Sequence, residues 1–102
     1  MSTFIDFEMS EYDKTIKKRF NNYKNVVNDP LGSILATIGT DMDSEDNKLK
    51  YLFSLLKIFI IENDEEKSHR VYSFIGDYLN KNTLSDEVKS KFTLSLKNYR
   101  NL

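Results

Sequence analysis

One segment, residues 45–62, limits the fold most, because apolar side chains cover most of its circumference when it is drawn as a helix. At 100° per residue, its main apolar face contains Leu49, Leu52, Phe53, Leu56, Phe59 and Ile60. A second apolar strip on the far side contains Tyr51, Leu55 and Ile58, and a narrow polar stripe contains Lys50, Ser54 and Lys57. Such a helix must be surrounded by others, so we expect it at the centre of the molecule.

Four further segments have helical periodicity, and they span residues 10–28, 30–38, 64–81 and 84–99. Their expected core faces contain Tyr12, Ile16, Phe20, Tyr23 and Val27; Leu31, Ile34, Leu35 and Ile38; Val71, Phe74, Ile75 and Tyr78; and Leu84, Val88, Phe92, Leu96 and Tyr99. The β-branched run at residues 58–61 also fits a strand. Its continuity with the helical face upstream favours a helix.

Polar residues at the segment ends predict where the helices begin. Ser10 with Asp13 resembles a capping box, and Asp29 precedes Pro30, which suits the first position of a helix. The other expected caps are Asp43 or Ser44 for the central helix, Asn63 with Glu66 for residues 64–81, and Thr83 for the last helix. Gly39 is expected to end the helix of residues 30–38 in a left-handed conformation.

These patterns together predict an all-α protein, a small four-to-five-helix bundle around one central apolar helix. A chain of 102 residues fits one domain, residues 1–102. We expect residues 1–9 to form an N-terminal arm that packs back on the core, and the alternative is an added helical turn from Thr3. No apolar stretch approaches the length of about 20 residues that a membrane-spanning helix needs. The chain start lacks the basic region of a signal peptide, so we expect a cytoplasmic protein.

The residue inventory argues against catalysis. The chain has no cysteine and one histidine, His69, which excludes thiolate zinc sites and cysteine nucleophiles. His69 lies nearly opposite the apolar face of its helix, so we interpret it as a solvated surface residue. The acidic residues 41–46 fail as a calcium loop, because Asp46 stands where glycine is required and Leu52 where a glutamate is required. We therefore predict no catalytic residue, metal or cofactor, and no enzyme activity.

A basic face on residues 10–28 is the strongest surface signal. Its residues are Lys14, Lys17, Lys18, Asn21 and Lys24, with no acid among them. Lys97 and Arg100 add positive charge near the end of the last helix. We expect these residues to contact an acidic protein partner. The alternative is a nucleic-acid-associated regulator in which the same lysines meet phosphates, although the net charge of −1 opposes strong nonspecific binding.

A few apolar residues lie off the expected core faces, namely Tyr51, Leu55, Ile58 and Leu94. Exposed together, they would mark a partner-binding surface, and a homodimer through the second strip of the central helix is a further expectation. We accordingly expect a non-catalytic protein-binding or regulatory protein whose activity depends on the shape and charge of its surface.

In size, helix rhythm and lack of catalytic residues, the chain resembles several families of small bacterial helical proteins. One is the bacteriocin immunity proteins of Gram-positive bacteria, which are antiparallel four-helix bundles. Another is the phage-encoded inhibitors that bind host enzymes or sigma factors. The resemblance covers the architecture of the whole chain and implies a role in binding and blocking another protein.

Overall fold

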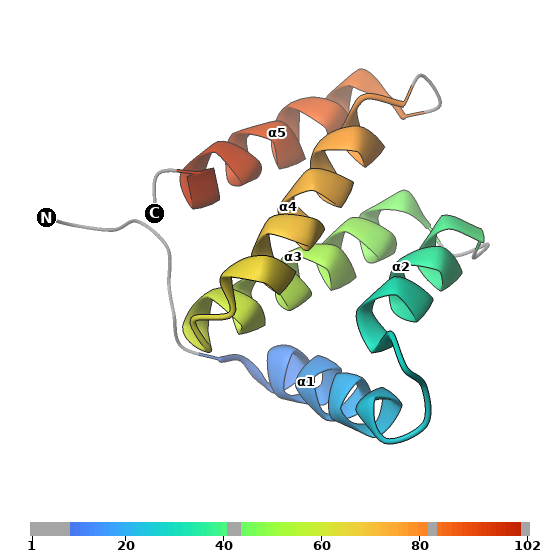
Figure 1. Cartoon of the computed structure of the whole chain (residues 1–102). Helices are drawn as coiled ribbons and strands as arrows, with labels where there is room; N and C mark the ends of the chain where they lie inside the picture. Colours follow the sequence, from blue (N-terminus) through green and yellow to red (C-terminus); the bar gives the residue numbers. More distant parts are fainter. Residues whose placement is uncertain (1–8, 41–43, 82–83, 101–102) are drawn as a thin grey trace, which may run out of the picture.

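The computed structural model describes residues 9–40, 44–81 and 84–100, and these residues form five helices and no strand (Figure 1). The helices are α1 (Glu11–Lys24), α2 (Pro30–Thr40), α3 (Glu45–Ile61), α4 (Glu65–Leu79) and α5 (Asp86–Arg100). The predicted all-α bundle is confirmed, and residues 58–61 are helical. Of the predicted N-terminal arm, residues 1–8 lie outside the described residues, and Met9 packs against the core.

The predicted caps of the first three helices are confirmed. The Ser10 hydroxyl accepts a hydrogen bond from the Asp13 N–H, and the Asp13 carboxylate accepts one from the Ser10 N–H, both at 3.1 Å. Asp29 accepts from the Gly32 N–H at 3.2 Å at the start of α2. Ser44 accepts from the third N–H of α3 at 3.2 Å, whereas its predicted alternative, residue 43, lies outside the described residues.

The caps of α4 and α5 differ from the prediction. Asp64 caps α4 by accepting a hydrogen bond from the N–H of Lys67 at 3.1 Å. Asn63, the predicted cap, has a φ of 58° and follows the end of α3, because asparagine tolerates the left-handed conformation that a helix end requires. Ser85 accepts from the third N–H of α5 at 3.3 Å. Thr83, the predicted cap there, lies outside the described residues.

Two predicted helix ends are also wrong. Helix α1 stops at Lys24 rather than residue 28, and Tyr23 and Val27 are 37% and 36% exposed instead of buried. The segment is rich in asparagine, a poor helix former, and the chain turns toward Pro30 before these side chains reach the core. Helix α2 continues past Gly39 to residue 40, and no described glycine has a positive φ.

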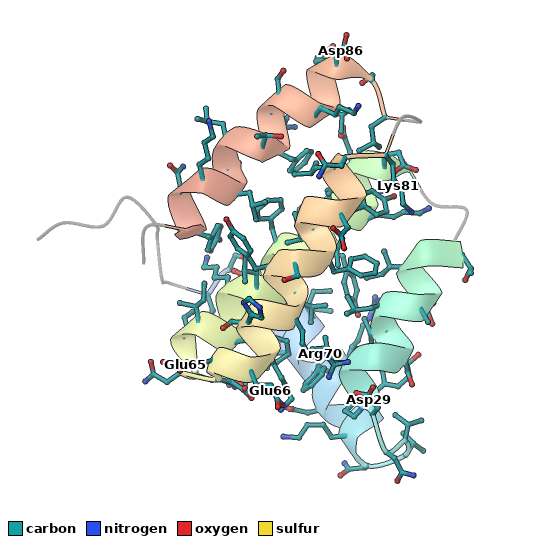
Figure 2. All side chains as sticks on the ribbon, turned by 45° about the horizontal axis from the view of Figure 1, so that its top comes forward. Asp29, Glu65, Glu66, Arg70, Lys81 and Asp86 are labelled. Atoms are coloured by element: carbon teal, nitrogen blue, oxygen red, sulfur yellow. The ribbon has the colours of Figure 1, made fainter. Side chains whose placement is uncertain are left out.

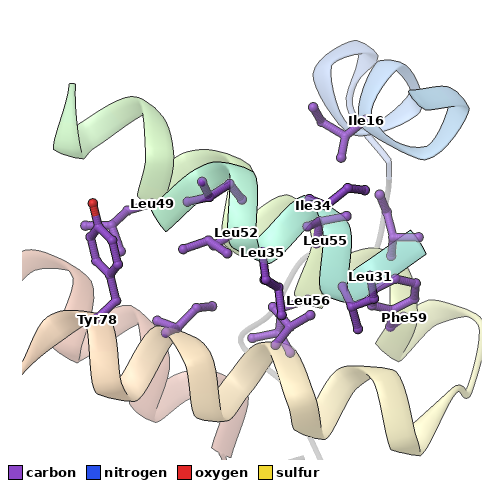
Figure 3. Packing of buried hydrophobic residues seen from close by; sticks show 14 of the residues in the cluster. Ile16, Leu31, Ile34, Leu35, Leu49, Leu52, Leu55, Leu56, Phe59 and Tyr78 are labelled. Atoms are coloured by element: carbon purple, nitrogen blue, oxygen red, sulfur yellow. The ribbon is translucent and has the colours of Figure 1, made fainter. Parts of the chain in front are cut away.

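The core forms where the apolar faces of the helices meet around α3. Helices α1, α4 and α5 pack on α3, and the buried face of α2 joins the same hydrophobic cluster. Figure 3 shows Leu31 and Ile34 of α2 beside side chains of α3, and Tyr78 of α4 beside Leu49 at the other end of the cluster. In the interior, the Phe20 and Phe59 rings meet edge to face with centroids 5.0 Å apart. The prediction that α3 is the central helix therefore agrees with the observed packing.

The second apolar strip of α3 is not a surface feature. Leu55 and Ile58 are 0% and 1% exposed, so the prediction that they contact a partner or form a homodimer is wrong. Neighbouring helices cover this part of α3 as well as most of its main apolar face, and this is the physical reason for the error. Leu94 on α5 is 66% exposed, as expected for a residue off the core face.

Part of the polar stripe of α3 is also covered by α1, where a buried carboxylate is the partner of two side chains of the stripe. Asp13 of α1 accepts a hydrogen bond from the Ser54 hydroxyl at 2.7 Å, and its other oxygen lies 3.0 Å from the Lys57 ammonium. Burial raises the pKa of Asp13, but the hydrogen bonds from Ser54, Lys57 and the Ser10 N–H outweigh that effect and leave the pKa below its ordinary value. One carboxylate thus caps α1 and joins it to α3.

A second polar contact joins α4 to the start of α2. The guanidinium of Arg70 places two nitrogens 3.3 Å from the two carboxylate oxygens of Asp29, and Figure 2 shows the two side chains together. Asp29 simultaneously caps α2, and a Cβ added at Gly32 would lie 2.2 Å from an Asp29 oxygen, so a larger residue there would displace the Asp29 side chain. This pair is solvent-exposed, so it aligns the two helices more than it stabilises them.

We expect Leu55→Ala to lower the free energy of unfolding by about 2–5 kcal/mol, because it leaves a cavity in the core. The matched control is Leu94→Ala on the exposed face of α5, where the change should stay within about 0.5 kcal/mol. Chemical denaturation of both variants measures the difference. Equal losses would contradict the burial of the second strip.

We expect Asp13→Asn to lower the free energy of unfolding at pH 7 by about 1–3 kcal/mol, because Ser54 and Lys57 lose a charged partner. The folded-state pKa of Asp13 is depressed, so its stabilisation is complete above the ordinary aspartate range and is lost as the pH falls through the folded-state pKa. Urea titrations should therefore show the wild-type advantage shrinking below about pH 4. Asp77→Asn, at an exposed site on α4, should have little effect at either pH; a pH-independent loss in Asp13→Asn would contradict this account.

Candidate functional site

Two lysines of the basic face predicted on the first helix are paired with carboxylates in the folded chain. The Lys14 ammonium lies 3.2 Å from a carboxylate oxygen of Glu11, and the Lys17 ammonium lies 3.1 Å from one of Glu62, the C-cap residue of α3. The prediction of a face free of acids is therefore wrong, because α3 brings a carboxylate to it. Lys18, Asn21 and Lys24 are exposed. The hydrogen bond from Lys67 lowers the pKa of Asp64, and the positive charge of Lys24 adds a smaller effect in the same direction.

The two predicted basic stretches do not form one surface. Lys97 is exposed near the end of α5, and Arg100 is the last residue of that helix. Figure 1 shows most of α1 on the far side of α3 and α4 from α5. A partner that contacts Lys18 therefore meets a different face from one that contacts Lys97.

His69 does not belong to a chemically convergent cluster. This residue is exposed on α4, in agreement with the prediction of a surface histidine, and it lines a shallow cavity of about 440 Å³ together with Glu65 and Tyr72. Within the described residues, no group of three or more histidine, aspartate or glutamate side chains is arranged to hold a metal ion.

The described residues contain a groove that the sequence did not single out. It lies between the start of α1, the middle of α3 and the second half of α5, and its volume is about 680 Å³. Its walls carry four aromatic rings, those of Tyr12, Phe53, Phe92 and Tyr99. We call this the aromatic groove. The Phe53 ring stacks on the Phe92 ring with centroids 5.6 Å apart and lies 5.7 Å from the Tyr99 ring.

The groove exists because α5 covers α3 incompletely. No described side chain of α5 is buried, and the apolar residues on its core face, Val88, Phe92, Leu96 and Tyr99, are all half-buried. The other helices each bury several side chains. Phe53 on α3 is half-buried for the same reason. The aromatic groove is therefore a place where apolar surface of the central helix remains accessible.

Two lysines give the aromatic groove a positive edge. The Lys50 ammonium lies 4.6 Å from the centre of the Tyr12 ring, and the Lys91 ammonium lies 5.1 Å from the centre of the Phe92 ring. Among the described residues, neither lysine has a carboxylate within 4.0 Å. Lys57 also lines the groove, but its charge is paired with that of Asp13. The sequence pattern did not predict that these side chains line one groove, because they come from three different helices.

Tyr51, the remaining residue of the predicted surface strip, lies in a separate cleft. It is half-buried, and burial raises the pKa of its hydroxyl while the nearby Arg19 acts in the opposite direction. This cleft lies between α1, α2 and α3. Tyr51 therefore does not act together with Leu55 and Ile58, which are in the core.

Comparison of the chain with models of known protein families, with curated proteins and with solved structures finds no match. A search of the described helices finds none with the length and apolar content needed to cross a membrane. The function of the chain must therefore be inferred from the geometry of the described residues.

Proposed function

We propose that the chain is a non-catalytic protein-binding domain, and that its docking surface is the aromatic groove. The observation that carries the proposal is the half-buried apolar face of α5 beside the accessible Phe53 of α3. Accessible aromatic side chains in a well-formed depression are the usual anchors of protein interfaces. A regulatory role, as an immunity-type protein or an inhibitor of another protein, is the finer form of this proposal.

The chemistry of the aromatic groove defines the partner segment. Its aromatic walls favour apolar side chains, and the ammonium groups of Lys50 and Lys91 favour acidic residues beside them. Asp46 also lines the groove, at its end near the start of α3, so the acids of the partner should lie toward Lys91. The partner is accordingly a short apolar segment flanked by aspartate or glutamate.

The nucleic-acid alternative has weaker support. Lys14 and Lys17, two of the four lysines on α1, are paired with carboxylates, so fewer positive charges remain to meet a phosphate backbone. Lys18 and Lys24 are exposed, but neither of them lines the aromatic groove. An oligonucleotide is therefore the competing ligand when the proposal is tested.

We expect selection of a phage-displayed peptide library on the full chain to enrich aromatic or aliphatic residues flanked by acids. Lys91→Glu should weaken the selected peptides at least about tenfold, because it turns an attractive charge at the groove into a repulsive one. Lys97→Glu is the matched control, since it makes the same change on α5 outside the groove. Fluorescence anisotropy with labelled peptides measures both variants.

Three results would contradict this proposal. Equal weakening by Lys91→Glu and Lys97→Glu would mean that overall charge, and not the aromatic groove, drives binding. Residues 4–8, Phe-Ile-Asp-Phe-Glu, have the composition expected of the partner, so a gain in affinity of about tenfold after deletion of residues 1–8 would identify the chain itself as the occupant. Oligonucleotide binding that falls steeply with salt and is lost in Lys18→Glu would favour the nucleic-acid regulator.

A further inference from the structure

The cleft between α1, α2 and α3 carries a second, chemically different set of side chains. Its volume is about 250 Å³. Arg19 of α1 and Lys48 of α3 supply two positive charges, and Ile34 and Ile38 of α2 supply apolar surface. No aspartate or glutamate is among the described residues that line it. The cleft therefore combines a net positive charge with an apolar wall.

Lys48 is largely withdrawn from water, and its ion pair with Glu45 is a long one. Its side chain is 11% exposed, and the nearest described carboxylate oxygen, on Glu45, lies 3.8 Å from its ammonium. That distance exceeds the roughly 2.7–3.2 Å of a charge-assisted hydrogen bond. The second carboxylate oxygen of Glu45 accepts a hydrogen bond from the Tyr78 hydroxyl. An anion in the cleft would give Lys48 the close partner that Glu45 does not.

Arg19 supplies the second charge from another helix. Among the described residues, no carboxylate lies within 4.0 Å of its guanidinium, which is near the hydroxyl of the half-buried Tyr51. The hydroxyls of Tyr23 and Thr37 also line the cleft. The Thr37 hydroxyl donates to the Ser33 carbonyl oxygen at 2.9 Å, so the side-chain donors of the cleft come from α1 and α3. A guanidinium binds an oxyanion through two parallel N–H groups.

We propose that this cleft binds a phosphoryl group carried on a compact apolar body. The phosphoryl oxygens would lie between Arg19 and Lys48, and the apolar body would rest on Ile34 and Ile38. A phosphoryl dianion offers three acceptor oxygens and matches the two cations in charge, whereas a carboxylate offers two oxygens and one charge. The site is independent of the aromatic groove, so either proposal can fail without the other.

Titration of the isotope-labelled full chain with phenyl phosphate, followed by two-dimensional NMR, tests the proposal. We expect saturable shifts at the amides of Arg19, Thr37, Lys48 and Tyr51. Inorganic phosphate and phenol are the two arms that separate the anion from the apolar body, and each should bind at least about tenfold more weakly than phenyl phosphate. Phosphate binding as tightly as phenyl phosphate would overturn the apolar part of the site, and phenol doing so would overturn the phosphoryl part.

Charge-neutral variants locate the site. Arg19→Gln and Lys48→Gln should each weaken phenyl phosphate at least about tenfold, because each removes a charge-assisted contact. Lys18→Gln removes a neighbouring positive charge that does not line the cleft, and it should weaken phenyl phosphate binding less than about threefold. Arg19 is exposed, so its variant reports on binding even where Lys48→Gln disturbs folding. Equal weakening by Lys18→Gln and Arg19→Gln, or shifts that do not saturate, would overturn the proposal.

Discussion

Helix α3 carries apolar side chains around most of its circumference, and the other four helices pack so that most of these side chains are buried. Transfer of apolar surface from water is the largest favourable term in folding, so a helix of this kind is unstable unless neighbours enclose it. The most deeply buried side chains come from α1, α2, α3 and α4, and they include Ile16, Leu31, Leu55 and Ile75. Even the polar stripe of α3 is partly enclosed, because Asp13 supplies a partner for Ser54 and Lys57.

The other helices do not cover α3 equally on all sides. As a result, two separate depressions remain beside α3, and a function is proposed for each. Helix α5 lies on α3 through half-buried aromatic contacts such as Phe53 with Phe92, which leaves the aromatic groove accessible. On the side where α1 and α2 meet α3, the gap is smaller and contains Arg19 and Lys48 beside apolar side chains. The first surface suits an apolar segment of another protein, and the second suits a small anion.

The sequence was sufficient to predict the helices because each has a local signal of 3.6-residue period and a nearby cap, as with Ser10 and Asp13. The sequence was insufficient to predict burial and pairing that depend on contacts between residues far apart in the chain. Leu55 and Ile58 looked exposed because periodicity shows that a strip is apolar without showing which helix covers it. Glu62 reaches Lys17 only after α3 has folded beside α1, and the aromatic groove combines side chains from three helices. Such arrangements are tertiary, and no single periodicity encodes them.

Native-state hydrogen exchange tests most directly whether α3 is the enclosed centre and α5 its loosest cover. Amides in protein interiors exchange through openings whose free energy rises from near zero in loosely packed elements to the global value in the core. We expect the amides around Leu52–Leu56 of α3 to exchange slowest, through global unfolding, and those of α5 to exchange at least about tenfold faster at the same intrinsic rate. Equal protection of α5 and α3, or fast exchange in the middle of α3, would contradict the account.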